Sequence, residues 1–351
     1  MRILAAMSGG VDSSVAAAIL KAQGYEVVGA TMKLWGGHSD TGCCSVADVD
    51  DARRVAQQLG LAHHVFNFSE EFDRHVVEPY VADHAAGRTP NPCIECNRHL
   101  KFDRFLERAV RLGFDAVATG HHARVTSGPD GTWELRRGVD SAKDQSYVLH
   151  MLGQAELSKT LLPVGEMTKA EVREMARSLG LRTAAKPDSQ DVCFISRTAG
   201  REVFLGDRIT LRPASVRDTE GNLVGELPAV ELVTVGQRRG LGDLGTVGGN
   251  RRYVVAVDSR TATVTVGDLD DLMVDSLAVS GISWVAHPPD ESEPLAVQMS
   301  AHGRPVAGVW RPGLPELAGT IDLEQTVRRV APGQSIVLYR GDAVVGGGIA
   351  A

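Results

Sequence analysis

The feature that most constrains the fold is a glycine turn close to the start of the chain. Ser8-Gly9-Gly10-Val11-Asp12-Ser13-Ser14 joins an apolar run at residues 3–7 to a helical pattern at residues 12–23. Paired glycines allow a tight turn, and the N–H groups and partial positive charge of a helix N-terminus can hold a pyrophosphate. A strand, a glycine turn and a helix in this order predict a parallel sheet covered by helices.

The same alternation of short apolar runs and helical periodicity continues to about residue 195. Strands are predicted at residues 26–32, 62–68 and 116–119, and helices at residues 47–59 and 97–112. Gly24, Gly60 and Gly113 follow predicted helices, at the place where glycine relieves left-handed backbone strain. A further helix is predicted from Thr168, which has capping-box spacing with Glu171, to residue 180.

After about residue 204 the pattern changes to short β-rich runs separated by glycine, proline and aspartate, with another break near Leu272. Strands are predicted at residues 210–217, 231–235, 252–257 and 263–266, and then at residues 277–284, 295–300, 319–323, 335–339 and 343–349. The last group is spaced as in a small β-barrel. We therefore predict an α/β parallel-sheet domain at residues 1–203, a small β-rich domain at residues 204–272 and a C-terminal β-barrel at residues 273–351.

The composition narrows the functional class. The chain has 351 residues, 43% of them hydrophobic and 23% charged, and no apolar run approaches the roughly 20 residues that span a bilayer. We expect a soluble, cytoplasmic protein without a membrane partner, and its five cysteines are too few for a disulfide scaffold. The net charge of −7 argues against indiscriminate nucleic-acid binding, so an RNA partner must meet a local basic patch. Candidates are Arg98, Lys101, Arg104, Arg108, Arg111, Arg238 and Arg239.

The glycine turn lacks the lysine of a Walker A motif and the G-x-G-x-x-G of dinucleotide folds. It resembles instead the PP-loop of enzymes that split ATP into AMP and pyrophosphate, in which Asp12 would hold magnesium or orient the phosphates. Adenosine is then expected at the carboxyl ends of neighbouring strands, near Met32 and Thr119-Gly120. The alternative is a purely structural turn in which Asp12 or Ser13 caps the helix.

Three cysteines stand in segments suited to chemistry. Cys93 and Cys96 lie in Thr89-Pro90-Asn91-Pro92-Cys93-Ile94-Glu95-Cys96-Asn97, a proline-rich loop before a helix, and Cys193 lies in the apolar run 192–195. A thiol at a helix N-terminus has a lowered pKa, and the thiolate is the nucleophile of sulfur transfer, which favours Cys96. Cys193 is equally consistent with a buried structural cysteine.

A C-x-x-C pair is also typical of a redox dithiol or half a metal site. Cys43-Cys44 offers a second half, although adjacent cysteines seldom ligate one zinc ion together. An iron–sulfur cluster held by Cys93, Cys96 and Cys193, with one iron open to sulfide, is the sharper metal alternative.

Taken together, these segments resemble the bacterial tRNA-specific 2-thiouridylases of the PP-loop ATP pyrophosphatase superfamily. The resemblance runs nearly from end to end. Its marks are residues 8–14, residues 89–97 with Lys101-Phe102, Ala118-Thr119-Gly120-His121, Lys143-Asp144-Gln145-Ser146-Tyr147, Cys193-Phe194-Ile195, Gly236-Gln237-Arg238-Arg239-Gly240-Leu241-Gly242 and Pro332-Gly333-Gln334. It implies a PP-loop (adenine nucleotide alpha hydrolase-like) first domain and a central tRNA-binding or adaptor domain.

The resemblance also implies the reaction, which is ATP-dependent 2-thiolation of the tRNA wobble uridine. ATP with Mg²⁺ adenylates the C2 oxygen, a persulfide on Cys193 delivers sulfur, and Cys96 acts as the nucleophile that ends in a Cys96–Cys193 disulfide. A cysteine desulfurase or relay protein would supply the sulfur. The implied ATP contacts are Ala6, Met7, Ser8, Gly9, Gly10, Val11, Asp12, Ser13, Met32 and Gly120. The implied contacts to the target base and the tRNA are Asn91, Pro92, Cys93, His121, Lys143, Asp144, Gln145 and Gln334.

The chain departs from the family pattern at two places. Cys93 stands where many relatives carry an aspartate that is a candidate acid or base, and residues 299–304 lack the Arg-Tyr pair that relatives present to tRNA. Two other functions stay open on sequence grounds. The PP-loop also occurs in ligases and amidotransferases, which need no cysteine pair, and a non-catalytic tRNA-binding protein could retain the same loop.

Overall fold

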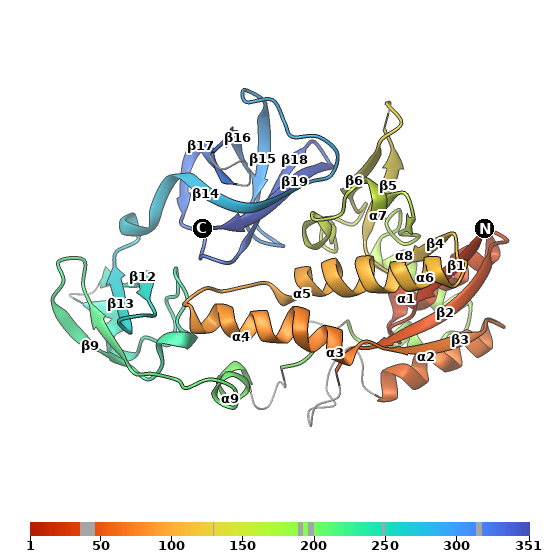
Figure 1. Cartoon of the computed structure of the whole chain (residues 1–351), viewed down its shortest axis with the longest axis horizontal. Coiled ribbons are helices and arrows are strands. Elements are labelled where there is room, and N and C mark those ends of the chain that lie inside the picture. The colour runs from red at the N-terminus through yellow and green to blue at the C-terminus, as the bar shows by residue number, and fades with distance from the viewer. Residues whose placement is uncertain (36–45, 129, 189–191, 196–199, 248–249, 314–317) are drawn as a thin grey trace.

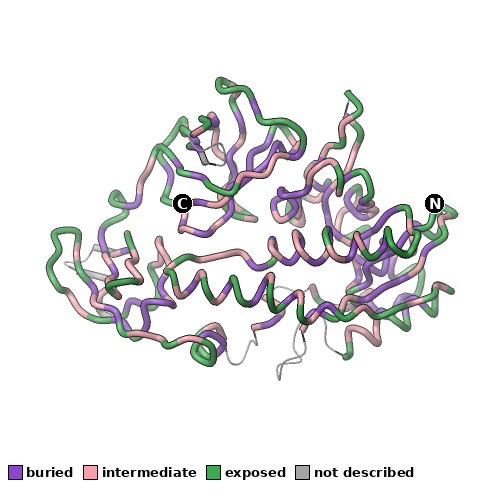
Figure 2. Tube along the Cα trace, viewed as in Figure 1, coloured by how far each residue is buried: buried purple, intermediate pink, exposed green. Residues whose placement is uncertain are grey.

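The structure is a computed structural model of the whole chain. It describes residues 1–35, 46–128, 130–188, 192–195, 200–247, 250–313 and 318–351. Cys43 and Cys44, considered above as half of a zinc site, lie outside the described residues. Buried residues gather in the N-terminal sheet and in the C-terminal barrel (Figure 2).

The N-terminal sheet is parallel and has the order β3-β2-β1-β4-β7 within the described ranges. Its strands are β1 (Arg2–Ala6), β2 (Glu26–Lys33), β3 (His63–Asn67), β4 (Ala116–Ala118) and β7 (Thr160–Leu161). The first four confirm predicted strands. β1 lies at the centre, where Ile3 and Leu4 are fully buried, so the chain enters the glycine turn from the interior of the sheet.

Three helices that pack around this sheet also confirm the predicted periodicity: α1 (Val11–Ala22), α2 (Val46–Gln58) and α8 (Lys169–Ser178). Val15, Val55 and Val172, one from each helix, are fully buried in a single apolar cluster. The expected capping box of α8 is present, with the Thr168 side chain accepting from the Glu171 N–H. α1 and α8 are packed against each other, which brings the start of α8 near the glycine turn.

Two long helical segments run side by side across the molecule (Figure 1). One consists of α3 (Ser69–Phe72), the π-helical turn η1 (Asp73–Val77) and α4 (Glu78–Ala85). The other consists of α5 (Pro92–Glu95), the π-helical turn η2 (Cys96–Arg104) and α6 (Phe105–Arg111).

The second helical segment begins five residues before the predicted start at residue 97. Asn91 caps it, because its side chain accepts from the Cys93 N–H at 3.1 Å, and Pro92 occupies the first helical position. The first helical segment escaped prediction because Pro79 interrupts its pattern. Here a π-helical turn precedes the proline, which falls in the first turn of α4.

The C-terminal strands close into a barrel, as predicted. In the described residues its order is β14-β17-β16-β15-β18-β19, and β14 pairs back onto β19. The strands are β14 (Met273–Trp284), β15 (Pro294–Gln298), β16 (Val306–Pro312), β17 (Ala318–Arg328), β18 (Ser335–Arg340) and β19 (Ala343–Ala350). Strand β16 and the hairpin of β5 (Ala123–Ser127) and β6 (Trp133–Arg137) were not predicted. The hairpin extends the barrel sheet through Arg136, which pairs with Ala343.

The segment that lies between these parts in the sequence forms a smaller sheet of order β12-β13-β8-β9, counted over the described residues. It comprises β8 (Ala214–Arg217), β9 (Leu223–Leu227), β12 (Tyr253–Asp258) and β13 (Thr263–Gly267). The strand predicted at residues 231–235 was wrong, since Val230–Leu232 form a 3₁₀ turn, η5. The buried Glu231 carboxylate accepts from the backbone and side chain of Arg212, and this pulls the segment out of strand geometry.

None of the helices in the described parts of the chain is long and apolar enough to cross a bilayer.

Candidate active site

The glycine turn is closed by its own hydroxyl groups. Ser13 Oγ accepts from the Ser8 N–H at 3.2 Å, and Ser14 Oγ donates to the Gly10 carbonyl at 2.7 Å. Gly9 has a φ of +73°, and a Cβ there would stand 2.3 Å from the Asp48 carbonyl oxygen of α2. The turn therefore requires glycine both for its backbone conformation and for the close approach of α2.

A second chain segment touches the turn from the carboxyl end of β4. A Cβ added to Gly120 would lie 2.5 Å from the Ser13 nitrogen, so this position also admits only glycine without a shift. Met32 lies at the carboxyl end of β2, beside β1, which leads into the turn. The structure thus gathers the residues predicted for ATP, from Ala6 to Ser13 with Met32 and Gly120, at one edge of the parallel sheet.

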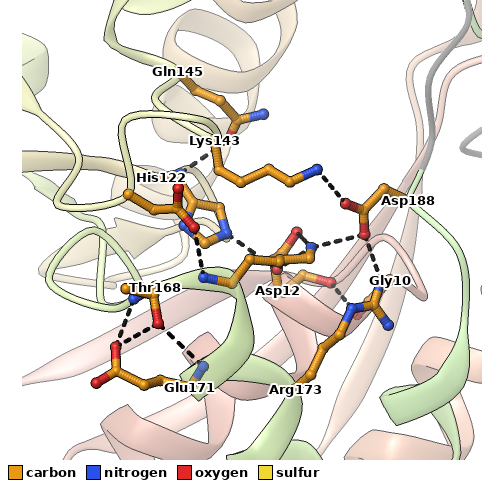
Figure 3. A network of polar contacts seen from close by, with 12 residues as sticks. Gly10, Asp12, His122, Lys143, Gln145, Thr168, Glu171, Arg173 and Asp188 are labelled. Carbon is orange, nitrogen blue, oxygen red and sulfur yellow. Dashed lines mark hydrogen bonds and ion pairs between the residues drawn. The ribbon is translucent and has the colours of Figure 1, made fainter.

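A charged network surrounds Asp12 (Figure 3). His122 Nε2 lies 3.2 Å from its carboxylate, and Lys169 Nζ donates to it at 2.7 Å. Burial alone would raise the pKa of Asp12, but the hydrogen bonds from His122 and Lys169 and the charge of Lys169 outweigh burial and hold the pKa below its ordinary value. Asp12 is therefore an anion at neutral pH, and it lies in the first turn of α1.

Asp188 is the second carboxylate of this network. Lys143 binds it at 2.8 Å, Lys169 at 2.9 Å and Arg173 at 2.7 Å (Figure 3). Burial opposes ionisation of Asp188, yet the hydrogen bonds and charges of Lys143 and Lys169 lower its pKa far below the ordinary range. Lys169 is shared between Asp12 and Asp188, so the glycine turn and the segment before Cys193 are connected through one ammonium group.

A second ammonium group ties the same segment to the other side of the turn. Lys186 Nζ donates to the Gly9 carbonyl at 3.0 Å and binds Asp48 at 2.6 Å and Asp51 at 2.8 Å. Burial would lower the pKa of Lys186, but the hydrogen bonds of Asp48 and Asp51 raise it above its ordinary value. Residues 186–188, just upstream of Cys193, are therefore fixed to both faces of the turn.

Sequence reasoning missed Lys169, Arg173, Lys186 and the role of Asp188. Lys169 and Arg173 stand four residues apart on α8, a spacing that places them on one helix face, but this spacing is common on solvated helices. Lys169 and Asp12, which form an ion pair, are 157 positions apart in the chain, so local spacing does not predict the contact.

Several residues predicted to contact tRNA lie next to this network. His121 is buried between Thr119 Oγ1 at 2.7 Å and Lys101 Nζ at 3.3 Å, and burial followed by the Lys101 charge lowers its pKa well below the ordinary value. His121 is therefore neutral. Gln145 exchanges hydrogen bonds with the His122 backbone, both at 2.9 Å.

Asp144, also predicted to contact tRNA, binds other parts of the chain. Its carboxylate accepts from Arg137 at 2.8 Å, from the Gly138 N–H at 3.0 Å and from the Ser146 N–H at 3.0 Å. Arg137 in turn stacks 3.7 Å above the Tyr339 ring of the barrel. Asp144 thus fixes the junction between the first domain and the barrel.

The predicted target-base loop, which leads to Asn91 and Cys93, is held by both β-rich parts. The Thr89 N–H donates to the Pro332 carbonyl at 2.7 Å, and Gln334 Nε2 donates to the Thr89 carbonyl. The Thr89 hydroxyl donates to Thr234 at 3.2 Å. Gln334, expected at the tRNA, therefore also secures the loop that carries the cysteine pair.

The cysteines differ in exposure. Cys93 is exposed as the second residue of α5, Cys96 is buried where the π-helical turn η2 begins, and Cys193 is half buried. Cys96 belongs to an apolar cluster with Phe194, and Cys193 packs against that same cluster. π-helical turns are rare and frequent at functional sites, which singles out the backbone around Cys96.

The metal alternative concerns Cys93, Cys96 and Cys193. The described residues, which include these three cysteines, contain no group of three or more histidine, cysteine or acidic side chains arranged to hold a metal ion.

Comparison with known proteins gives full-length matches. Residues 1–197 match the tRNA methyl transferase HUP domain, residues 202–268 the tRNA methyl transferase PRC-barrel domain, and residues 274–350 the aminomethyltransferase beta-barrel domain. A tRNA-specific 2-thiouridylase MnmA of Chloroflexus aurantiacus is 47% identical over 99% of this chain and 97% of its own length. The proteins of the same name from Mycobacteroides abscessus and Corynebacterium kroppenstedtii are 44% and 43% identical, over 98% and 99% of this chain and 96% and 94% of their own lengths.

These relatives cover the chain from the glycine turn to the barrel. Sequence identity of this size over the whole length shows membership of one family. This chain belongs to the tRNA-specific 2-thiouridylase family.

Proposed function

We propose that the protein is an ATP-dependent tRNA-uridine 2-sulfurtransferase. The observation that carries this proposal is the attachment of the Cys193 segment to the glycine turn, through Lys186 on one side and Asp188 on the other. A nucleotide-splitting turn alone would suit many ligases. A turn joined to a cysteine segment, with a second cysteine in the same apolar cluster, suits activation followed by sulfur transfer.

In the first step the backbone N–H groups at the start of α1 hold the phosphates of ATP. Asp12 is the candidate ligand for Mg²⁺, because a carboxylate anion is the oxygen donor this ion prefers. Bound there, Mg²⁺ would neutralise phosphate charge. Ala6 to Ser13, Met32 and Gly120 form the proposed nucleotide contacts.

The target uridine leaves its stack and enters beside Asn91, Pro92 and Cys93. Its C2 oxygen attacks the α-phosphorus of ATP, which forms an oxygen–phosphorus bond and expels pyrophosphate. His121, Lys143, Asp144, Gln145 and Gln334 form the proposed tRNA surface. Adenylation is necessary because oxide is a poor leaving group from an amide-like carbon, whereas AMP is a good one.

The second step uses both cysteines. The terminal sulfur of a Cys193 persulfide attacks C2, a carbon–sulfur bond forms, and AMP departs with the original oxygen. The Cys96 thiolate then attacks Cys193 Sγ, so the bond to the transferred sulfur breaks and its electron pair remains on the thiouridine. A Cys96–Cys193 disulfide is left, and an external dithiol must reduce it. A cysteine desulfurase or relay protein is the proposed source of the persulfide sulfur.

We propose residues 1–203 as the catalytic domain, with residues 204–272 and 273–351 as the β-rich domains that bind tRNA. Arg238 and Arg239 are exposed in the central part, and Lys101 and Arg104 lie on η2. Binding through these cations predicts an affinity that falls steeply with added salt. Reversing the charge of Arg238 and Arg239 without loss of affinity would refute this placement.

The test of function is reconstitution. Purified protein is incubated with ATP, unmodified tRNA, and a cysteine desulfurase with cysteine. The tRNA nucleosides are then analysed by mass spectrometry, and AMP is quantified in the same samples. The proposal predicts 2-thiouridine at the wobble position and AMP in equal amount. Replacing Cys193 by serine separates the alternatives. The proposed enzyme would lose 2-thiouridine formation, another PP-loop ligase would form its own product and AMP as before, and a non-catalytic tRNA-binding protein would yield no AMP with either chain.

The iron–sulfur alternative has its own test. Protein purified without oxygen is assayed for iron and for visible absorbance. A cluster mechanism requires iron in proportion to active enzyme, whereas the persulfide mechanism predicts full activity in protein without iron.

A further inference from the structure

Phe194, the neighbour of Cys193, is one of the most thoroughly enclosed side chains of the protein. It is 1% exposed. Its ring centroid lies 5.1 Å from that of Phe204, 5.4 Å from Tyr80, 5.7 Å from Phe72 and 6.2 Å from Trp35. All four distances fall within the range of direct aromatic contact. We call these four residues the aromatic cage.

The cage is built from separate parts of the chain. Trp35 follows β2, Phe72 closes α3, Tyr80 lies in α4 and Phe204 in α9 (Gly200–Gly206). The cage rings also touch each other, since Trp35 lies 6.3 Å from Phe72 and Tyr80 lies 6.2 Å from Phe204. A ring fixed by several elements at once cannot shift without disturbing all of them, so the cage holds Phe194 in one place.

This anchor limits where Cys193 can stand. Consecutive Cα atoms are about 3.8 Å apart, so the backbone of Cys193 must remain beside the caged ring. Cys96 belongs to the same apolar cluster as Phe72, Tyr80 and Phe194, and Cys193 packs against it. A disulfide needs Cα atoms within about 4.4–6.8 Å of each other, so a small displacement of either cysteine is enough to prevent the bond.

The cage also adjoins the nucleotide side. Trp35 follows Met32, the proposed adenosine contact, by three residues on the same strand and its extension. The ionic attachments at Lys186 and Asp188 fix the chain upstream of Cys193, and the cage fixes it downstream. The chain is therefore fixed by ionic contacts at Asp188, five residues before Cys193, and by aromatic contacts at Phe194, directly after it.

We propose that Phe194 is a positioning residue that sets the reach of Cys193 toward Cys96 and the activated uridine, and that takes no part in ATP binding. The inference rests on the proposed function, because it assigns Cys193 the persulfide. Phe194 touches neither nucleotide nor base in this account. Its effect is confined to the sulfur-transfer step.

The test compares Phe194→Ala and Phe194→Leu with Ile321→Ala, which removes a buried side chain from the barrel core. Pyrophosphate, which leaves in the activation step, and 2-thiouridine are quantified in the same single-turnover reaction with desulfurase and cysteine. We expect Phe194→Ala to release pyrophosphate at close to the normal rate but to thiolate roughly ten- to a hundredfold more slowly, the scale of a misplacement of about 1 Å. Phe194→Leu, which fills much of the space inside the cage, should recover part of the loss. Ile321→Ala should leave the ratio of the two rates unchanged.

A second readout does not depend on catalysis. The reduced protein, without ATP or tRNA, is treated with a mild oxidant, and the Cys96–Cys193 disulfide is followed by peptide mass spectrometry. We expect it to form more slowly in Phe194→Ala than in the wild-type protein and in Ile321→Ala. If the alanine variant fails to fold, the leucine variant decides by the same two readouts.

Two results would overturn the inference. One is an equal fall in the rates of pyrophosphate release and 2-thiouridine formation in the Phe194 variants, which would assign the residue a general structural role. The other is an unchanged rate of disulfide formation. Failure of the wild-type protein to make any 2-thiouridine would instead defeat the proposed function, and the oxidation experiment would still judge Phe194.

Discussion

The glycine turn and the cysteine segments are held by opposite kinds of contact. Around the turn, Asp12 and Asp188 meet Lys169 and other cations in a network of ion pairs. Around the cysteines, Cys96 and Phe194 lie in an apolar cluster of aromatic and aliphatic side chains. The first region can receive a charged triphosphate and exchange one set of ionic partners for another. The second fixes geometry and excludes water.

This difference suggests that the turn serves activation of the uridine and that the cysteine region serves the sulfur transfer that follows. Activation of the uridine depends on charge, because phosphates must be bound and pyrophosphate released. Sulfur transfer depends on placement, because a persulfide reacts well once it is close enough to its target. Changes in the cysteine region should therefore lower thiolation without lowering pyrophosphate release, whereas changes at the turn should lower both.

The largest separation is expected from the cysteines. Cys193→Ser or Cys96→Ser should lower 2-thiouridine formation by at least about a thousandfold, as for loss of a covalent nucleophile. Pyrophosphate release should persist, because adenylation precedes sulfur transfer and neither thiol belongs to the glycine turn. Single-turnover reactions in which pyrophosphate and 2-thiouridine are quantified check this. Cys93→Ser tests the third thiol, which lies at the proposed target-base loop, and a comparable loss with that variant would favour a chemical role for it.

A change at the turn should lower both products together. In Gly120→Ala the new Cβ would meet the Ser13 nitrogen at 2.5 Å and Asp12 at 2.7 Å. Strain of about 1–3 kcal/mol corresponds to roughly a ten- to hundredfold loss of ATP affinity. Gly153→Ala, whose nearest contact is the flexible Glu156 side chain at 3.4 Å, is the control. Normal ATP affinity in Gly120→Ala, measured by titration calorimetry, would place the nucleotide elsewhere.

A smaller effect is expected at the loop that joins the two regions. Gln334→Ala removes the hydrogen bond to the Thr89 carbonyl, and the loss of one such bond corresponds to a roughly two- to tenfold change. Because the loop leads to the cysteine pair, thiolation should fall more than pyrophosphate release. If Gln334 served only to bind tRNA, the change would appear in the KM for tRNA and saturating tRNA would restore both products.

The smallest effect concerns stability. The pKa of Asp188 is lower in the folded protein than in the unfolded chain. The contribution of its ionised carboxylate to the free energy of unfolding is therefore fully present above the unfolded pKa of about 4, and it is lost as the pH falls toward the folded pKa. Asp188→Asn should therefore lower the Tm by about 2–4 °C at neutral pH. The gap between the variant and the wild-type protein should narrow below about pH 4. A difference in Tm that stays constant with pH would show that Asp188 does not stabilise the fold through ion pairs.

The two regions also differed in how well the sequence predicted them. The turn, its strand and helix α1 follow from local pattern, because Gly9, Gly10 and the apolar run before them are adjacent in the chain. The capping box of α8 was equally local. The contacts of Lys169 with Asp12 and of Lys186 with Gly9 were missed, since each joins residues more than a hundred positions apart and such contacts leave no periodic signal.

The cysteine region was predicted in its residues but not in its surroundings. The helix of residues 69–85, which supplies Phe72 and Tyr80 to the aromatic cage, escaped notice because Pro79 interrupts its periodicity. Phe194 was seen as part of an apolar run, and only the fold brings the four cage rings around it. Packing among distant segments depends on tertiary structure and cannot be read from local spacing.

The central claim, that one nucleobase is first activated at the turn and then thiolated by the cysteines, has a direct isotopic test. A tRNA anticodon stem–loop is prepared with the heavy isotope of oxygen at C2 of the target uridine, and AMP from a complete reaction is examined by mass spectrometry. The account predicts that the label appears in AMP, one atom for each 2-thiouridine formed. AMP without label, alongside normal thiolation, would contradict it.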